Sequence, residues 1–201
     1  MDILILLLAA FAGVAFVNAQ EQKRRIALLG HHLGQYQIEA LMETITQGYL
    51  RALGEDDAER REQIWSLLTG AERSVAEQFG RFAQAFSQVD AAASRVSKLA
   101  LALPGASRLL PGATFDVREA FRLHAAGIAS AVANEAQGPS RDKAFTLSAE
   151  LFLMQHTCHW FCRSRAVASA RLLRRHQTSH EQVLAAVSPA TRRAYRELTG
   201  I

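Results

Sequence analysis

Apolar residues recur at helical spacing along most of the chain, and no stretch after the N-terminal segment sustains the two-residue alternation of a β-strand. The clearest pattern predicts one long helix over about 69–103, which opens with the capping-box spacing of Thr69 and Glu72 and stops at Pro104. Apolar residues within it alternate steps of four and three, as in the seam of a coiled-coil-like helix that packs lengthwise against another helix. The seam consists of Val75, Phe79, Phe82, Phe86, Val89, Ala93, Val96, Ala100 and Leu103.

Cap and turn residues divide the remaining chain into further helices. An apolar face that includes His124 follows Thr114, and we expect His124 to be a hydrogen-bonded core histidine. Before the long helix, the segments are a helix over 26–53 and a short helix opened by Asp56 and Glu59. A connector at 104–112 follows the long helix, and after it come a helix from Thr114 to Gly138 and a helix from Ser140 past Leu173. The last two are a segment opened by Ser179 and Gln182 and a helix from Pro189 to Leu198, between Ser188 and Gly200. These segments predict an all-α fold, with an N-terminal helix followed by a helical bundle.

The first residues have a different pattern, because residues 3–19 carry no charge and ten of these seventeen are Ile, Leu, Phe or Val. Each such residue favours membrane insertion by roughly 0.3–0.6 kcal/mol. We therefore expect residues 1–20 to be a transmembrane anchor and residues 21–201 to be one helical domain. The alternative is a signal peptide cleaved after 17–19, although Asp2 stands where a signal peptide carries positive charge.

Positive charge follows the apolar stretch at Lys23, Arg24 and Arg25. The positive-inside rule keeps this side in the cytoplasm, with the short N-terminus outside. The layout is similar to that of bacterial single-pass proteins with a cytosolic body, and it predicts an inner-membrane location. Cleavage of the apolar segment would instead predict a periplasmic protein.

The composition agrees with one folded domain, since 49% of the 201 residues are hydrophobic and there are only 12 glycines and 4 prolines. The net charge of +4 is concentrated at the ends of the domain. From Arg163 onward, eight arginines face two glutamates, so this segment carries +6 and the rest of the chain −2.

In a tethered chain, anionic lipid is the cheaper partner for this charge, and the alternative is a solvated arginine face that binds no partner. Nucleic acid is disfavoured, because interleaved aromatic residues and a recognisable reading motif are both missing from the sequence. The residues expected at the membrane surface are Lys23, Arg24, Arg25, Arg171, Arg174 and Arg175.

The segment 156–162 is the one chemically dense cluster, with two histidines, two aromatic residues and both cysteines of the chain. On a helix, Cys158 and Cys162 share an apolar face with Leu151, whereas His156 and His159 point to other faces. This arrangement favours buried structural thiols. The alternative is a metal or haem site built on Cys158, His159 and Cys162, although the C-x-x-C-H and H-E-x-x-H orders are both missing. A disulfide between thiols four residues apart on one helix is disfavoured by geometry.

The sequence contains no glycine-rich phosphate loop, no G-x-S-x-G elbow and no supported pair of acids, so a non-enzymatic role is favoured and no cofactor is predicted. We expect a membrane-anchored scaffold or adaptor that binds a protein partner, or a second copy of itself, along a helical face. The alternative is a membrane-bound redox, metal or haem protein centred on the segment 156–162.

Overall fold

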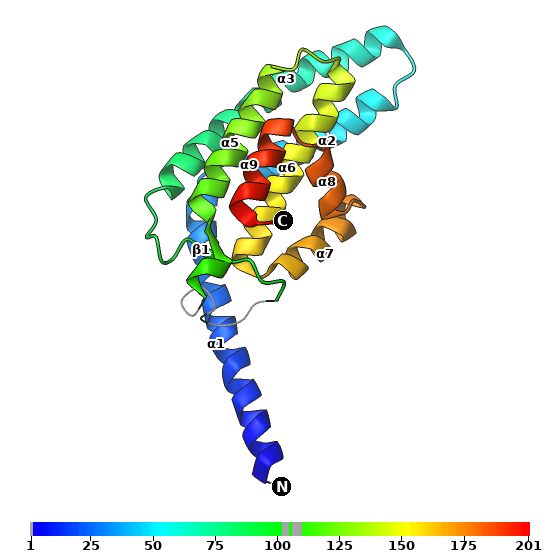
Figure 1. The fold of residues 1–201 in the computed structure, drawn as a ribbon. Coiled ribbons are helices and arrows are strands. Elements are labelled where there is room, and N and C mark those ends of the chain that lie inside the picture. The colour runs from blue at the N-terminus through cyan, green and yellow to red at the C-terminus, as the bar shows by residue number, and fades with distance from the viewer. Residues whose placement is uncertain (1, 102–104, 106–109) are drawn as a thin grey trace.

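The computed structural model describes residues 2–101, 105 and 110–201, and it has the predicted all-α architecture, with 78% helix and 3% strand (Figure 1). Most of the connector expected at 104–112, together with Leu103, lies outside the described residues. The helices are α1 (Asp2–Leu33), α2 (Ile38–Leu53), α3 (Ala58–Phe86), α5 (Val117–Ala133), α6 (Ser140–Cys162), α7 (Arg165–His176), α8 (His180–Ala186) and α9 (Pro189–Thr199). A 3-10 turn (Pro111–Ala113) and two short strands, β1 (Arg95–Ser97) and β2 (Thr114–Asp116), complete the described elements.

The long helix expected at 69–103 is wrong at both ends, because α3 covers Ala58–Phe86. Its N-cap is Asp57, whose carboxylate accepts the backbone N–H of Arg60 at 2.8 Å. Thr69 lies inside the helix, where its hydroxyl donates to the Trp65 carbonyl, so it caps nothing. The separate short helix expected after Asp56 is therefore the first part of α3.

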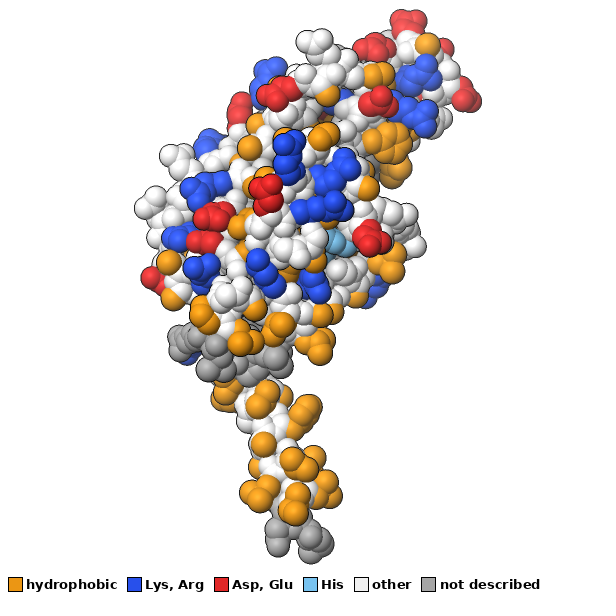
Figure 2. Space-filling model, viewed as in Figure 1, with side chains coloured by type: hydrophobic (Ala, Val, Ile, Leu, Met, Phe, Trp, Pro, Cys, Tyr) orange, Lys and Arg blue, Asp and Glu red, His pale blue; other side chains and the backbone are white. Residues whose placement is uncertain are grey.

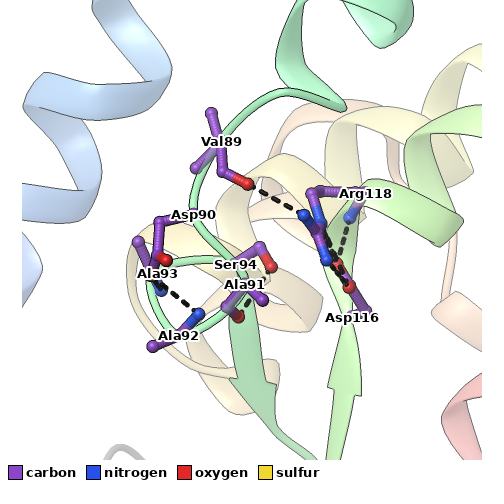
Figure 3. Close-up of polar contacts among 8 residues, drawn as sticks. All are labelled: Val89, Asp90, Ala91, Ala92, Ala93, Ser94, Asp116 and Arg118. Carbon is purple, nitrogen blue, oxygen red and sulfur yellow. Dashed lines mark hydrogen bonds and ion pairs between the residues drawn. The ribbon is translucent and has the colours of Figure 1, made fainter.

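After α3 the chain forms a turn and a β-hairpin in place of helix (Figure 3). The Asp90 carboxylate accepts the N–H groups of Ala92 and Ala93 at 2.9 and 3.1 Å, which competes with helical hydrogen bonding. Arg118 pairs with Asp116 at 2.7 Å and donates to the Val89 carbonyl at 2.9 Å. These contacts hold β1 antiparallel to β2, with Val96 opposite Phe115.

Three other helix boundaries differ from the expectation. The segment 26–53 is interrupted between Leu33 and Ile38, and α5 ends at Ala133, where Asn134 takes the left-handed conformation with φ 53°. The helix expected to run from Ser140 past Leu173 is broken between α6 and α7. Ser164 caps α7 there by accepting the N–H of Val167 at 3.3 Å.

Two predictions for the C-terminal helices are confirmed. The capping box of Ser179 and Gln182 opens α8. Ser188 caps α9, and Gly200 ends it with φ 75°.

The centre of the bundle is an aromatic cluster between α3, α5 and α6. Phe121 lies with its ring centroid 5.0–6.2 Å from those of Phe79, Phe82 and Phe86, and all four side chains are fully buried. The three phenylalanines of the seam therefore find their partner within the same chain. Trp160 of α6 connects the hairpin to this core, because its indole N–H donates to the Ser97 carbonyl at 3.0 Å.

Helix α1 has two unlike halves (Figures 1 and 2). Its N-terminal half extends away from the bundle, and its large apolar residues from Ile3 to Val17 are exposed. Its second half packs on the bundle, where Leu29 is buried and Arg25 donates to the Phe161 carbonyl at 3.3 Å. The span Ile3–Leu33 is long and apolar enough to cross a membrane.

Candidate functional site

A groove of about 780 Å³ runs between α1 and α2 on one side and α6 and α7 on the other. We call it the α1–α6 groove. It combines an apolar floor with a charged rim, and it brings together five residues singled out from the sequence. These five are Cys158, His159, Cys162, Arg171 and Arg175.

The floor is apolar and contains both thiols. Cys158 donates to the sulfur of Met154 at 3.9 Å, and Cys162 is buried one turn further along α6. Both cysteines are free. Burial raises the pKa of both thiols above the ordinary range, to about 11 for Cys162. Because reactive cysteines have lowered pKa values, these thiols are suited to packing.

At pH 8, we expect iodoacetamide to alkylate Cys162 about 100-fold more slowly in the folded chain than in the urea-unfolded chain. Only the thiolate reacts, and a pKa raised from 9.0 to about 11 lowers its population by about that factor. The measurement is the time course of alkylation by mass spectrometry. Equal rates in the folded and unfolded chains would show a reactive thiol and would favour the redox interpretation of the segment 156–162.

The candidate metal ligands Cys158, His159 and Cys162 line the same groove, but they make different contacts. His159 Nδ1 lies 3.1 Å from an Nη atom of Arg171, so it accepts from the guanidinium and offers no lone pair there. Burial, followed by the neighbouring Arg171 and Arg175, lowers the pKa of His159 to about 4. Within the part of the chain that the structure describes, no three His, Cys, Asp or Glu side chains are arranged to hold a metal ion.

The rim carries three arginines, Arg163, Arg171 and Arg175, along the α6–α7 edge. Arg163 hydrogen-bonds Gln22 of α1, which places its guanidinium at the α1 end of the groove. Glu39 and Glu43 border the opposite edge, on α2. The groove is therefore electrostatically asymmetric across its width.

The residues expected at a membrane surface separate into three groups. Arg171 and Arg175 line the groove, while Arg174 is exposed on the same helix outside it. Lys23 and Arg24 are exposed on α1. Arg25 differs, because its guanidinium pairs with Glu21 at 2.5 Å and lies over the Phe161 ring. The Arg25 side chain thus attaches α1 to the bundle.

A second cavity, of about 500 Å³, adjoins the groove further along α2 and α6. We call it the α2–α6 cavity. Large apolar side chains are exposed around it, with Leu50 71% and Phe145 51% exposed, and Leu53 beside them. Glu43 and Arg175 line both cavities. Helical spacing did not single out these exposed residues, because it does not tell which apolar face is covered.

No protein-family model, curated protein or solved structure matches the chain.

A buried polar network on the other side of α6 was not foreseen from the sequence. His124 of α5 and Tyr195 of α9 both reach the Thr157 hydroxyl, at 2.8 and 3.2 Å. Because Thr157 donates its own hydrogen to the Leu153 carbonyl at 3.1 Å, it accepts from His124 Nε2, which leaves Nδ1 as the bare nitrogen. His124 is thus the hydrogen-bonded core histidine that the sequence predicted.

His156 belongs to the same buried region. Its Nε2 lies 3.1 Å from the Ser169 hydroxyl of α7, and its ring lies 4.3 Å from that of His180. Burial is the main cause that lowers the pKa of His124 to about 3 and that of His156 to about 2. His176 and His180 are four residues apart but lie on different helices, because the α8 cap at Ser179 separates them.

Glycine at position 127 lets α5 approach α6 and α9 closely, and we expect Gly127→Ala to destabilise the protein by about 1–2 kcal/mol. A Cβ atom there would lie 2.5 Å from Glu150 Oε2 and 2.5 Å from Thr191 Oγ1, both on buried residues. Overpacking costs about 1–3 kcal/mol, partly offset by the better helix propensity of alanine.

The measurement is urea unfolding of the full chain in mild detergent. Gly80→Ala is the matched control, because its Cβ meets nothing within 4 Å in α3. The control should be stabilised by about 0.5–1 kcal/mol. A Gly127→Ala variant as stable as this control would contradict the close approach of α5, α6 and α9.

Proposed function

We propose that this protein is a membrane-anchored, non-catalytic helical scaffold. In this proposal α1 holds the chain in a bilayer, and the exposed face around the α2–α6 cavity binds a protein partner. The observation that carries the proposal is the division of α1: its first half exposes apolar side chains, while its second half packs on the bundle. One continuous helix would then connect the bilayer to the binding domain without a flexible linker.

The proposed orientation places the bundle in the bacterial cytoplasm. Lys23 and Arg24 are exposed directly after the apolar stretch, and positive charge at this position favours the cytoplasmic side. The alternative is cleavage after Ala19 and a periplasmic body, since an apolar N-terminal helix also suits a signal sequence. Intact-mass measurement of the membrane fraction tests this point: a chain starting at Met1 or Asp2 supports the anchor, and a chain starting at Gln20 overturns it.

The proposed partner contact is an amphipathic helix seated on the α2–α6 cavity. Leu50, Leu53 and Phe145 offer an apolar surface of the kind that accepts the apolar face of a helix. Glu43 and Arg175 flank it with both signs of charge, which suits a partner helix with mixed charges on its polar sides.

Photo-crosslinking in intact cells tests the contact, with the crosslinker placed at Leu50. Leu67 is the matched control, because it is an exposed leucine, 81% exposed, that lines neither cavity. We expect a discrete adduct from position 50, weakened by Leu53→Glu, and none from position 67. An adduct of twice the chain mass would identify a second copy as the partner. A chain that is monomeric and gives equal, diffuse labelling at both positions would overturn the proposal.

A further inference from the structure

We propose that the α1–α6 groove binds one anionic acyl lipid from the leaflet that α1 enters. The proposal rests on the membrane anchoring proposed above and adds a ligand to it. It is carried by three features of the groove, namely its position on α1, its apolar floor and the arginines on one rim.

The position follows from helix geometry. Ile26, Leu29 and Leu33 line the groove, and they lie on the same continuous helix as the apolar stretch that ends at Ala19. At about 1.5 Å per residue, Ile26 is only about 10 Å beyond Ala19. The polar headgroup layer on each side of a bilayer is about 5–8 Å deep. Gln22, which Arg163 hydrogen-bonds at the α1 end of the groove, is only about 5 Å beyond Ala19, so this end of the groove would lie at the level of the lipid headgroups.

The floor suits an acyl chain. Met42, Met154 and Cys158 provide polarizable, apolar contacts, and the volume of about 780 Å³ falls in the ordinary range for ligand pockets. Gly30 of α1 also lines the groove, and a Cβ atom at this position would meet no atom within 4 Å. The helix therefore leaves open space here where any larger side chain would enter the groove.

The rim favours a negatively charged ligand group along one edge of the groove. Arg163 and Arg171 lie on the α6–α7 edge, and guanidinium groups bind phosphate oxygens through paired hydrogen bonds. His159 accepts from one Nη atom of Arg171, which orients the guanidinium and leaves its other N–H groups for a ligand. Glu39 and Glu43 on the α2 edge repel an anion, so the headgroup would lie at the arginine edge and the acyl chain on the floor.

The test uses the full chain reconstituted in phosphatidylcholine vesicles that contain a minor fraction of phosphatidylglycerol. Native mass spectrometry after mild detergent extraction measures how much of each lipid remains bound. We expect one phosphatidylglycerol per chain. The retained amount should fall at least about tenfold in Gly30→Leu, which fills the groove, and in the double variant Arg163→Gln/Arg171→Gln, which removes two of the three rim charges.

The matched controls are Gly13→Leu, on the exposed half of α1, and Arg174→Gln, on α7 outside the groove. Both should retain phosphatidylglycerol at the wild-type level. The proposal is overturned if phosphatidylcholine is retained equally, or if both groove variants keep the lipid. It is also overturned if Gly30→Leu keeps the lipid and loses the adduct at position 50, because the groove would then belong to the protein partner.

The outcomes distinguish a failure of the lipid site from a failure of the proposed membrane-anchored scaffold. A chain that inserts into vesicles and forms its adduct at position 50, yet retains no lipid, contradicts only the lipid site. A chain that fails to enter the vesicles contradicts the membrane anchor, whatever lipid it carries.

Discussion

Acidification from pH 7 to pH 5 should lower the free energy of unfolding by about 2 kcal/mol for each of His124 and His156. Burial holds their pKa values in the folded chain at about 3 and about 2, whereas the ordinary value is 6.5. Below pH 6.5 the unfolded chain therefore binds protons that the folded chain excludes. Stability contributed by these histidines is complete above pH 6.5 and is lost progressively as the pH falls toward the folded-state values.

The groups that face these two histidines do not reverse the loss of stability on acidification. His124 faces Thr157 of α6 and Tyr195 of α9, and His156 faces Ser169 of α7 and His180 of α8. Burial is also the main cause that lowers the pKa of His180, so it adds in the same direction. Glu150 acts in the opposite direction, because burial raises the pKa of its carboxyl group. Protonation of this carboxyl group on acidification removes the cost of burying its charge.

Urea unfolding at pH 7 and pH 5, followed by circular dichroism of the full chain in mild detergent, measures this loss. The double variant His124→Gln/His156→Gln keeps side-chain amides that can reach Thr157 and Ser169 but cannot take up the protons. Its loss of stability between the two pH values should be smaller than that of the wild type by about 4 kcal/mol. An unchanged loss would show that these rings are not buried in their neutral form.

Phe121→Ala should destabilise the protein by about 3–5 kcal/mol, the range for removing a large aromatic side chain from a packed core. Phe121 is fully buried, and its ring contacts three phenylalanines of α3 edge to face. Its loss leaves a cavity between α3 and α5 that neither helix can close alone.

Phe145→Ala is the matched control, because Phe145 is 51% exposed on α6. It should cost less than about 1 kcal/mol in the same urea titration. Similar losses for the two variants would contradict the position of the core between α3, α5 and α6.

For the segment 156–162, helical geometry predicted the face of each cysteine and histidine but not the groove that three of these side chains line. Angles around α6 placed Cys158 and Cys162 on one apolar face and His156 on another, and the structure agrees. The same geometry separated His159 from the thiols, yet His159 lines the same groove, because the opposing helices α1 and α7 enclose a wide sector of α6. Angles on one helix cannot define a cavity whose other wall comes from sequence-distant helices.

Local chemistry in the sequence determined the elements whose signals lie within a few residues. The apolar stretch at 3–19, the capping box of Ser179 and the Ser188–Gly200 boundaries of α9 are of this kind, because each is decided by neighbouring side chains and their own backbone.

Only the tertiary structure decided where α3 and α6 end. Residues 91–93 are alanines with strong helix propensity, but Asp90, Arg118 and the pairing of β1 with β2 hold them in a turn. The break after Cys162 likewise depends on the Ala166 N–H, which donates to the Ala100 carbonyl at 3.0 Å. The protonation states of His124 and His156 belong to the same class, because burial by several helices displaces water from groups that the sequence alone would leave solvated.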